Sequence, residues 1–295
     1  MRWQNRWGRW GVRWGAFAVL VVAAASRWVV SEARPEAEPT LTSLTMGCVW
    51  ASLVSLMLLR RGPARVSLRG SWLGVVAGAM VFGGPAVGAL LRAREMDGAS
   101  LTMALALTPV AAGIASASLG RGSLDGAAGR IWPGLAAVGG LLLVLAEPNL
   151  GDVRSDVALL LAPVLTGVGA ALFCVRGGGT RWRATSALLG GTLLFAVTLV
   201  AESVASRTRP TVSLLAMACD GVLALASVYA LQRIGATRWT AQFTLVPLLI
   251  VLEGLALAHQ ALTLRWVVGI ALLALASLYL LLPSTDEPEG LRFQD

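Results

Sequence analysis

Ten long apolar stretches divide the chain, and they constrain its fold more than any other feature. They run over residues 14–31, 40–59, 71–91, 98–119, 131–147, 156–175, 184–203, 212–232, 238–258 and 264–283. A helix needs about 20 mostly apolar residues to cross a bilayer. Strands of a membrane barrel would be shorter and would alternate, whereas these stretches are continuous. We therefore expect an all-α integral membrane protein with ten transmembrane helices.

The overall composition excludes an ordinary water-soluble protein. Apolar residues make up 56% of the chain and charged residues only 14%, whereas about 25% of a soluble protein is charged. Every compact fold leaves much of its surface exposed, so a soluble fold could not hide this much apolar surface. Lipid is the solvent that fits the composition.

The positive charge is distributed as membrane topology requires. The net charge is +8, and all basic residues are Arg, clustered between the apolar stretches. This clustering argues against nucleic-acid binding, which favours a continuous basic face. With the N-terminus inside, the cytoplasmic segments hold 16 Arg and the outer segments seven. Because cytoplasmic loops carry the excess of Arg, we expect a multi-pass protein of the cell (inner) membrane with both termini cytoplasmic. The richness in Arg and Ala without Lys suggests a bacterial source.

Two features near the helix ends bear on this topology. Trp14, Trp72, Trp132, Trp182 and Trp239 fall at expected cytoplasmic ends, where amphipathic rings prefer the headgroup level. The first stretch also has the basic lead and the small residues of a cleaved signal peptide. Cleavage would leave nine spans and cut the internal repeat described below, so a retained first span is favoured.

The reactive residues offer little for catalysis, metal binding or disulfide formation. The three cysteines, at positions 48, 174 and 219, lie inside apolar stretches, and His259 is the only histidine. A zinc site needs about four Cys, His or carboxylate ligands, and an enzyme needs placed acid, base or metal groups. We expect no cofactor, no metal, no catalytic residue and no enzymatic activity.

The two halves of the chain carry the same landmarks in the same order. The first half has Gly-Ala-Ser at 98–100, Leu-Thr-Pro-Val at 107–110 and Pro-Gly-Leu at 133–135; the second has Gly-Ala-Thr at 235–237, Leu-Val-Pro-Leu at 245–248 and Val-Gly-Ile at 268–270. Internal repeats of this kind indicate a duplicated structural unit. We place the repeats at 1–150 and 151–284, followed by a polar cytoplasmic tail at 285–295. Five spans per repeat make the second copy enter the membrane inverted, which is typical of secondary transporters.

These landmarks resemble the EamA domain of the drug/metabolite transporter (DMT) superfamily, present twice. The resemblance covers residues 14–284 and rests on the Gly-Ala-Ser/Thr starts, the Leu-x-Pro-Val/Leu segments and the Gly-containing closing spans. It implies ten helices in two inverted five-helix repeats, with a cavity for a small-molecule substrate between them. Many relatives carry Glu shortly after spans 4 and 9, where this chain has Arg121 and Gln260.

Two prolines at matching places are candidates for broken helices. Pro109 and Pro247 each lie about ten residues into a span, near the bilayer midplane by helix rise. Proline removes a backbone donor and clashes with the preceding turn. Broken helices at equivalent places in two repeats mark transport sites, and the alternative is a passive packing kink.

A few polar residues inside the spans are candidates for binding substrate or a coupling ion. Glu253 lies on one face of its span with Gln242, and Asp220 lies on one face of the preceding span with Ser227. A carboxylate inside a membrane costs roughly 2.5–3.5 kcal/mol and is by default a functional candidate. Glu253 could instead reach water at the outer end. Arg27, inside the first span, could pair with Asp220 or Glu253, which would give the pair a structural role.

We expect a secondary active transporter that moves a small metabolite or amphipathic solute by alternating access. Export is the favoured direction, and proton coupling stays open. The alternative is a non-transporting membrane protein of the same fold that acts as a scaffold or partner.

Overall fold

The structure, a computed structural model of the whole chain, is entirely helical over the residues it describes. These residues are 4–33, 40–59, 68–92, 98–120, 128–145, 153–175, 180–206, 213–258 and 263–282. The expected polar tail at 285–295 lies outside them.

Every one of the ten apolar stretches lies on one or two of the helices. Their bounds are α1 Gln4–Ala33, α2 Leu41–Leu59, α3 Leu68–Val81, α4 Gly83–Arg92, α5 Gly98–Leu105, α6 Thr108–Ser118, α8 Ile131–Val144, α9 Val153–Phe173, α10 Thr180–Ser206, α11 Leu214–Trp239, α12 Gln242–Ala258 and α13 Leu264–Leu281. The pair α3 and α4 fills one stretch, and the pair α5 and α6 fills another.

The length and surface of these helices are those of a membrane protein. In the described part of the chain, seven helical segments are long and apolar enough to cross a bilayer, and three shorter apolar helices accompany them, at Trp14–Arg27, Ile131–Val144 and Gln242–Leu257. Large apolar side chains face outward, among them Leu264 and Val204 with 80% and 74% of their surface exposed. Such a surface suits hydrocarbon and not water. The expectation of an all-α membrane protein is confirmed at this level.

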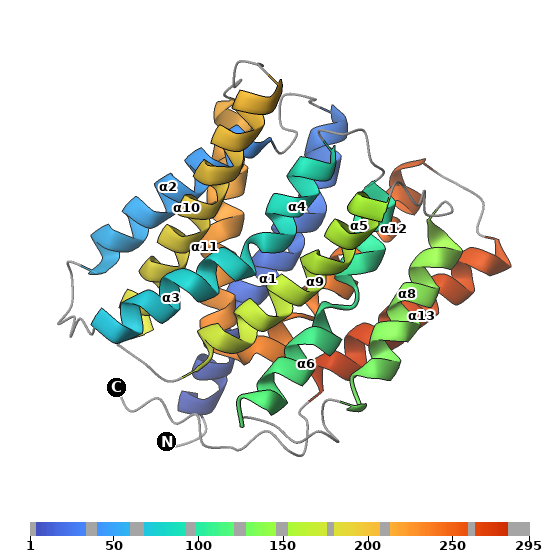
Figure 1. Cartoon of the computed structure of the whole chain (residues 1–295). Coiled ribbons are helices and arrows are strands. Elements are labelled where there is room, and N and C mark those ends of the chain that lie inside the picture. Colours follow the sequence, from blue (N-terminus) through green and yellow to red (C-terminus); the bar gives the residue numbers. More distant parts are fainter. Residues whose placement is uncertain are drawn as a thin grey trace.

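The helices form one bundle with a pair of helices at its edge (Figure 1). The helix α1 packs against α11 and α12, and α9 packs against α3, α4, α5 and α6. The helix α10 lies between α2 and α3, and α2 also packs against α11. The helices α8 and α13 pack mainly against each other on one side of the bundle.

Two close helix contacts depend on glycine. A Cβ atom on Gly78 of α3 would collide with the backbone of Ala187 on α10, and one on Gly140 of α8 would lie 2.8 Å from the carbonyl oxygen of Gly269 on α13. Between membrane helices, small residues let backbones approach until dispersion contacts become favourable. Gly78 and Gly140 therefore serve the close packing of their helices.

Helices are interrupted at three places inside the apolar stretches. Phe82 separates α3 from α4, just before Pro85, which has no backbone N–H to continue the helix. Residues 106–107 separate α5 from α6, and residues 240–241 separate α11 from α12. Pro109 is one of the first two residues of α6, so it lies at a break as the sequence predicts.

The second half of the chain differs from the expectation in two details and agrees with it in a third. Pro247 lies inside α12 and not at the break. The helix expected to end near residue 232 is interrupted close to that place, at Gly235, whose φ of 82° and ψ of 167° are non-helical, so α11 consists of two helical parts joined at a kink. Trp239 is not an exposed ring: only 1% of it is exposed, and it packs edge-to-face with Phe243 at 5.5 Å between ring centroids.

Candidate functional site

A buried ion pair joins helix α1, in the first half of the chain, to helix α11, in the second half. The guanidinium NH2 of Arg27 on α1 lies 2.9 Å from Oδ1 of Asp220 on α11. Only 9% of Arg27 and 5% of Asp220 are exposed. The sequence predicted Asp220 or Glu253 as the partner of Arg27, and the structure shows that the partner is Asp220.

The start of α11 and the end of α1 determine how deep this pair lies along the two helices. The helix α11 begins after Ser213, whose hydroxyl accepts a hydrogen bond from the backbone N–H of Ala216 at 3.3 Å, as a helix cap does. Asp220 therefore lies about 10 Å along α11 from its start. Arg27 lies about 9 Å before the last residue of α1, Ala33, by the same helix rise. Both charges are well inside their helices.

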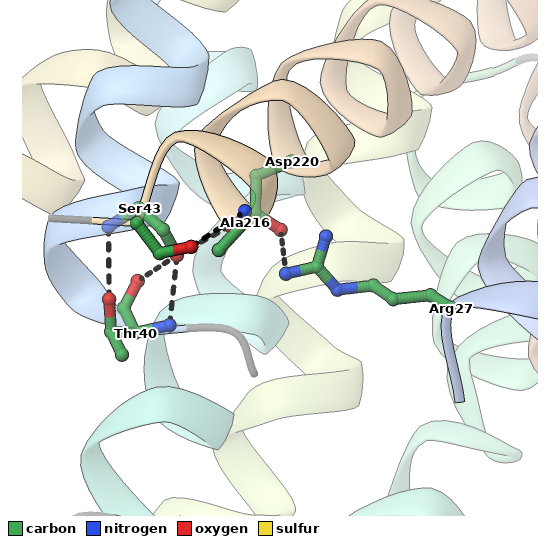
Figure 2. A network of polar contacts seen from close by, with 6 residues as sticks. Arg27, Thr40, Ser43, Ala216 and Asp220 are labelled. Atoms are coloured by element: carbon green, nitrogen blue, oxygen red, sulfur yellow. Dashed lines mark hydrogen bonds and ion pairs between the residues drawn. The ribbon is translucent and has the colours of Figure 1, made fainter. Parts of the chain in front are cut away.

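Ser43 of α2 completes the group, as Figure 2 shows: it approaches Asp220 from the side opposite Arg27. Its Oγ lies 2.6 Å from Oδ2 of Asp220 and 3.0 Å from the carbonyl oxygen of Thr40. The hydroxyl has one proton to donate, and the shorter bond to a charged acceptor is the stronger one. The same Oγ accepts from the backbone N–H of Thr40 at 2.9 Å, and the Thr40 hydroxyl accepts from the N–H of Ser43 at 3.1 Å. Thr40 and Ser43 thus cap α2 reciprocally.

Two glycines bring α2 and α11 close enough for this bond. A Cβ on Gly47 would lie 2.7 Å from the backbone nitrogen of Gly221 and 2.9 Å from Cβ of Asp220. A Cβ on Gly221 would lie 2.5 Å from the ring of Trp50. Neither glycine could gain a side chain without moving the helices apart, so the carboxylate is held against the start of α2.

The electrostatics of the site favour a paired state. Removing a single charge from water costs several kcal/mol, and only a partner in good geometry offsets that cost. Both oxygens of Asp220 have a donor, from Arg27 and from Ser43. The three helices α1, α2 and α11 are therefore tied together at one point by charge and hydrogen bonding.

Glu253 lies apart from this group. It is half-buried on α12, and its Oε2 is a buried atom without a hydrogen-bond partner among the described residues. A buried polar atom without a partner is uncommon and calls for an explanation in each case. Glu253 therefore stays a separate candidate for binding a proton, an ion or a substrate group.

The remaining predicted site residues are not brought to Asp220. Gln242 is buried at the start of α12, beyond Gly235, which is about 22 Å along α11 from Asp220 by helix rise. Ser227 is half-buried two turns along α11 from Asp220 and takes no part in the network. Among the described residues, no three His, Cys, Asp or Glu side chains are grouped to hold a metal ion.

Sequence reasoning missed the hydroxyl groups of the site. Ser43 lies in a stretch that also holds Thr42 and Thr45. Elsewhere in the bundle, Ser277 of α13 donates a hydrogen bond to the Thr244 hydroxyl of α12 at 2.8 Å. Ser and Thr are common in membrane helices, where they bond to the carbonyl one turn back, as Thr45 does to Leu41. Only the three-dimensional contact distinguishes Ser43 from its neighbours.

Comparison with known proteins extends the description of the fold. No family model and no curated protein matches the chain. Solved structures do match it: one, described only as the crystal structure of a protein, aligns with a TM-score of 0.64 over 91% of this chain and 98% of its own. The two sequences are 15% identical, so the likeness is one of fold. The arrangement of helices is thus shared, over 91% of this chain, with a structure determined by experiment.

Proposed function

We propose that the chain is a secondary active transporter of the EamA type, in the drug/metabolite transporter superfamily. It moves a small metabolite or amphipathic solute across the cell membrane by alternating access between two inverted five-helix halves. The observation that carries this proposal is the matched packing of helices in the two halves of the chain.

Helix contacts pair up when the first half is exchanged for the second. The exchange takes α1 to α9, α2 to α10, α3 with α4 to α11, α5 with α6 to α12, and α8 to α13. The contacts of α1 with α11 and α12 then become those of α9 with α3, α4, α5 and α6, all of which are present. The contact of α2 with α11 becomes that of α10 with α3, also present. A two-fold relation between the halves accounts for this pattern.

The contact between α8 and α13 fits the same relation. A Cβ on Gly140 would meet the carbonyl oxygen of Gly269 at 2.8 Å, and a Cβ on Gly269 would meet the carbonyl oxygen of Gly140 at 2.8 Å. Reciprocal contacts of this kind arise where a two-fold axis passes between two elements. In the predicted repeats Gly269 corresponds to Gly134 and not to Gly140, so the contact fits the relation as a contact between the two closing helices α8 and α13.

The two breaks that follow the Gly-Ala-Ser/Thr motifs also correspond. At the first, the N–H of Leu107 donates to the carbonyl of Ala104, and the Thr108 hydroxyl donates to the carbonyl of Leu105 at 2.6 Å. At the second, the N–H of Ala241 donates to Arg238, and the Thr240 hydroxyl donates to Thr237 at 2.6 Å. Irregular backbone inside a membrane is tolerated where its polar groups are satisfied, and in transporters it marks the substrate site.

Flux measurements on the purified protein in liposomes test the proposal. The liposomes contain the pH-sensitive dye pyranine and are exposed in turn to amphipathic amines, carboxylates and zwitterions. We expect a dye or tracer signal for one class, lowered by Asp220→Asn or Glu253→Gln and unchanged by Thr45→Val. Thr45 is a matched control because its hydroxyl bonds only to its own helix.

One result would count against the assigned residues, and another would count against transport itself. Wild-type flux untouched by both carboxylate variants would remove Asp220 and Glu253 from the mechanism. An absence of flux for every class would favour the alternative, a non-transporting membrane protein of the same fold.

A further inference from the structure

We propose that Arg27, Asp220 and Ser43 form an ionic latch that holds one end of the bundle closed. The inference rests on the proposed function, because a latch matters only if the two halves move. It assigns the buried pair a conformational role and not the role of binding substrate. The latch lies at the end of the bundle where α2 and α11 begin (Figures 1 and 2).

The position of the three residues suits a latch. Arg27 on α1 and Ser43 on α2 belong to the first half of the chain, and Asp220 on α11 belongs to the second. Both oxygens of the carboxylate bond across that division, at 2.9 Å and 2.6 Å. Moving one half against the other at this end must therefore break both bonds together. A ligand or water that pairs with the separated charges would stabilise the open arrangement.

The matching contact elsewhere in the bundle has different chemistry. The 137-residue offset between Gly98 and Gly235 takes Arg27 and Asp220 to Val164 and Gly83. At that place the N–H of Gly84 on α4 donates to the buried hydroxyl of Thr166 on α9 at 3.1 Å. The bond there is between neutral groups. An ion pair in one copy and a neutral bond in the other make the two ends unequal, so the latched end is favoured closed in the absence of ligand.

The chain carries its own reporters for this opening. Cys48 lies on α2 past Ser43, with 2% of its surface exposed, and it follows Gly47, on which a Cβ would lie 2.9 Å from Cβ of Asp220. In Figure 1, α9 ends at the end of the bundle opposite to the starts of α2 and α11. Cys174 directly follows the last residue of α9, Phe173, and is half-buried. Opening at the latch would admit water to Cys48 and leave Cys174 unchanged or less accessible.

The experiment measures the rate at which a charged methanethiosulfonate reagent modifies each thiol. One background keeps only Cys48 (Cys174→Ser, Cys219→Ser) and the other keeps only Cys174 (Cys48→Ser, Cys219→Ser). The protein is held in lipid nanodiscs, where both faces are accessible and no substrate is needed. Into each background go Arg27→Gln, Asp220→Asn and Ser43→Ala, with Arg27→Lys as the control that keeps the charge.

We expect Arg27→Gln and Asp220→Asn to speed modification of Cys48 by about tenfold, because a small change in the energy gap multiplies a minor open population. Ser43→Ala should have a smaller effect in the same direction, and Arg27→Lys should stay near the parent rate. Cys174 should not react faster in any of them.

Unchanged Cys48 rates in both charge variants would overturn the latch. Faster reaction at Cys48 and Cys174 together would also overturn it, since that pattern reports a general loosening of the fold. A failure of transport with the expected labelling pattern would refute the proposed function and leave the latch in place. The two proposals can therefore fail separately.

Discussion

Asp220 and Glu253 are both carboxylates inside apolar helices, but their surroundings differ. Asp220 is 5% exposed and has donors on both oxygens. Glu253 is half-buried and has one buried oxygen without a partner among the described residues. A carboxylate with a donor on each oxygen serves to hold a structure, whereas a carboxylate with an oxygen that lacks a donor has capacity left for a ligand. The two acids are thus suited to different roles, the first in conformation and the second in binding.

Removing one member of the pair should destabilise the protein strongly. Arg27→Met leaves Asp220 buried without its counter-charge, which costs about 3–5 kcal/mol of unfolding free energy. The double variant Arg27→Met, Asp220→Leu should recover most of that loss, because apolar side chains replace both charges. Unfolding by SDS titration in mixed micelles measures both values. A single variant as stable as the parent would contradict the desolvated pair.

Part of this site could be predicted from the sequence. Charges within the apolar stretches are few, and the sequence suggested Asp220 or Glu253 as the partner of Arg27. The structure shows that the partner is Asp220. Helical periodicity grouped Gln242 with Glu253, and it groups residues on a face without showing what that face meets. Ser43 carried no signal, because its role depends on where α2 meets α11.

At the scale of helices, the apolar stretches correctly predicted where helices form but not where those helices are interrupted. Each stretch became helical, but α3 with α4 and α5 with α6 are interrupted, and α11 is kinked at Gly235. Proline explains the break near Pro109 and fails at Pro247, which α12 accommodates. The bend comes instead at Gly235, where φ is 82°. A positive φ is a property of the folded chain, and a glycine-rich sequence does not show which glycine will adopt it.

Gly235→Ala should therefore distort the link between α11 and α12. Its φ of 82° and ψ of 167° belong to a region almost restricted to glycine, and a residue with a side chain there costs about 1–3 kcal/mol. We expect a lower unfolding free energy and reduced flux in liposomes. Gly15→Ala is the matched control, since a Cβ on Gly15 meets nothing within 4 Å. Equal stability of the two variants would argue against the bend.

Neighbouring glycines on α8 allow a sharper test of helix contact. Gly140→Ala places a methyl 2.8 Å from the carbonyl oxygen of Gly269, and overpacking of this kind costs about 1–3 kcal/mol. A Cβ on Gly139 meets nothing within 4 Å, so Gly139→Ala should be neutral or stabilise the helix by up to about 1 kcal/mol. The difference in unfolding free energy between these two variants reads out the α8–α13 contact. If the order were reversed, the helices would not meet as described.

At the scale of the whole molecule, the account depends on two halves with opposite orientation. The odd number of predicted spans per half and the matched helix contacts, including that of α8 with α13, support it. Inversion is what lets two similar units exchange conformations and expose one site to each side in turn. Composition established the membrane environment, and the order of landmarks suggested the repeat. The contacts between halves required the structure, because they join residues far apart in the chain.

Sidedness of two equivalent loops tests this inversion most directly. Fusions of a green fluorescent protein and of alkaline phosphatase are made after Gly122 and after Gln260, which follow the fourth and ninth predicted spans. The first reporter fluoresces only in the cytoplasm, and the second is active only outside it. We predict fluorescence for the fusion at Gly122 and phosphatase activity for the fusion at Gln260. The same reporter active at both positions would show that the halves share one orientation and would contradict the account.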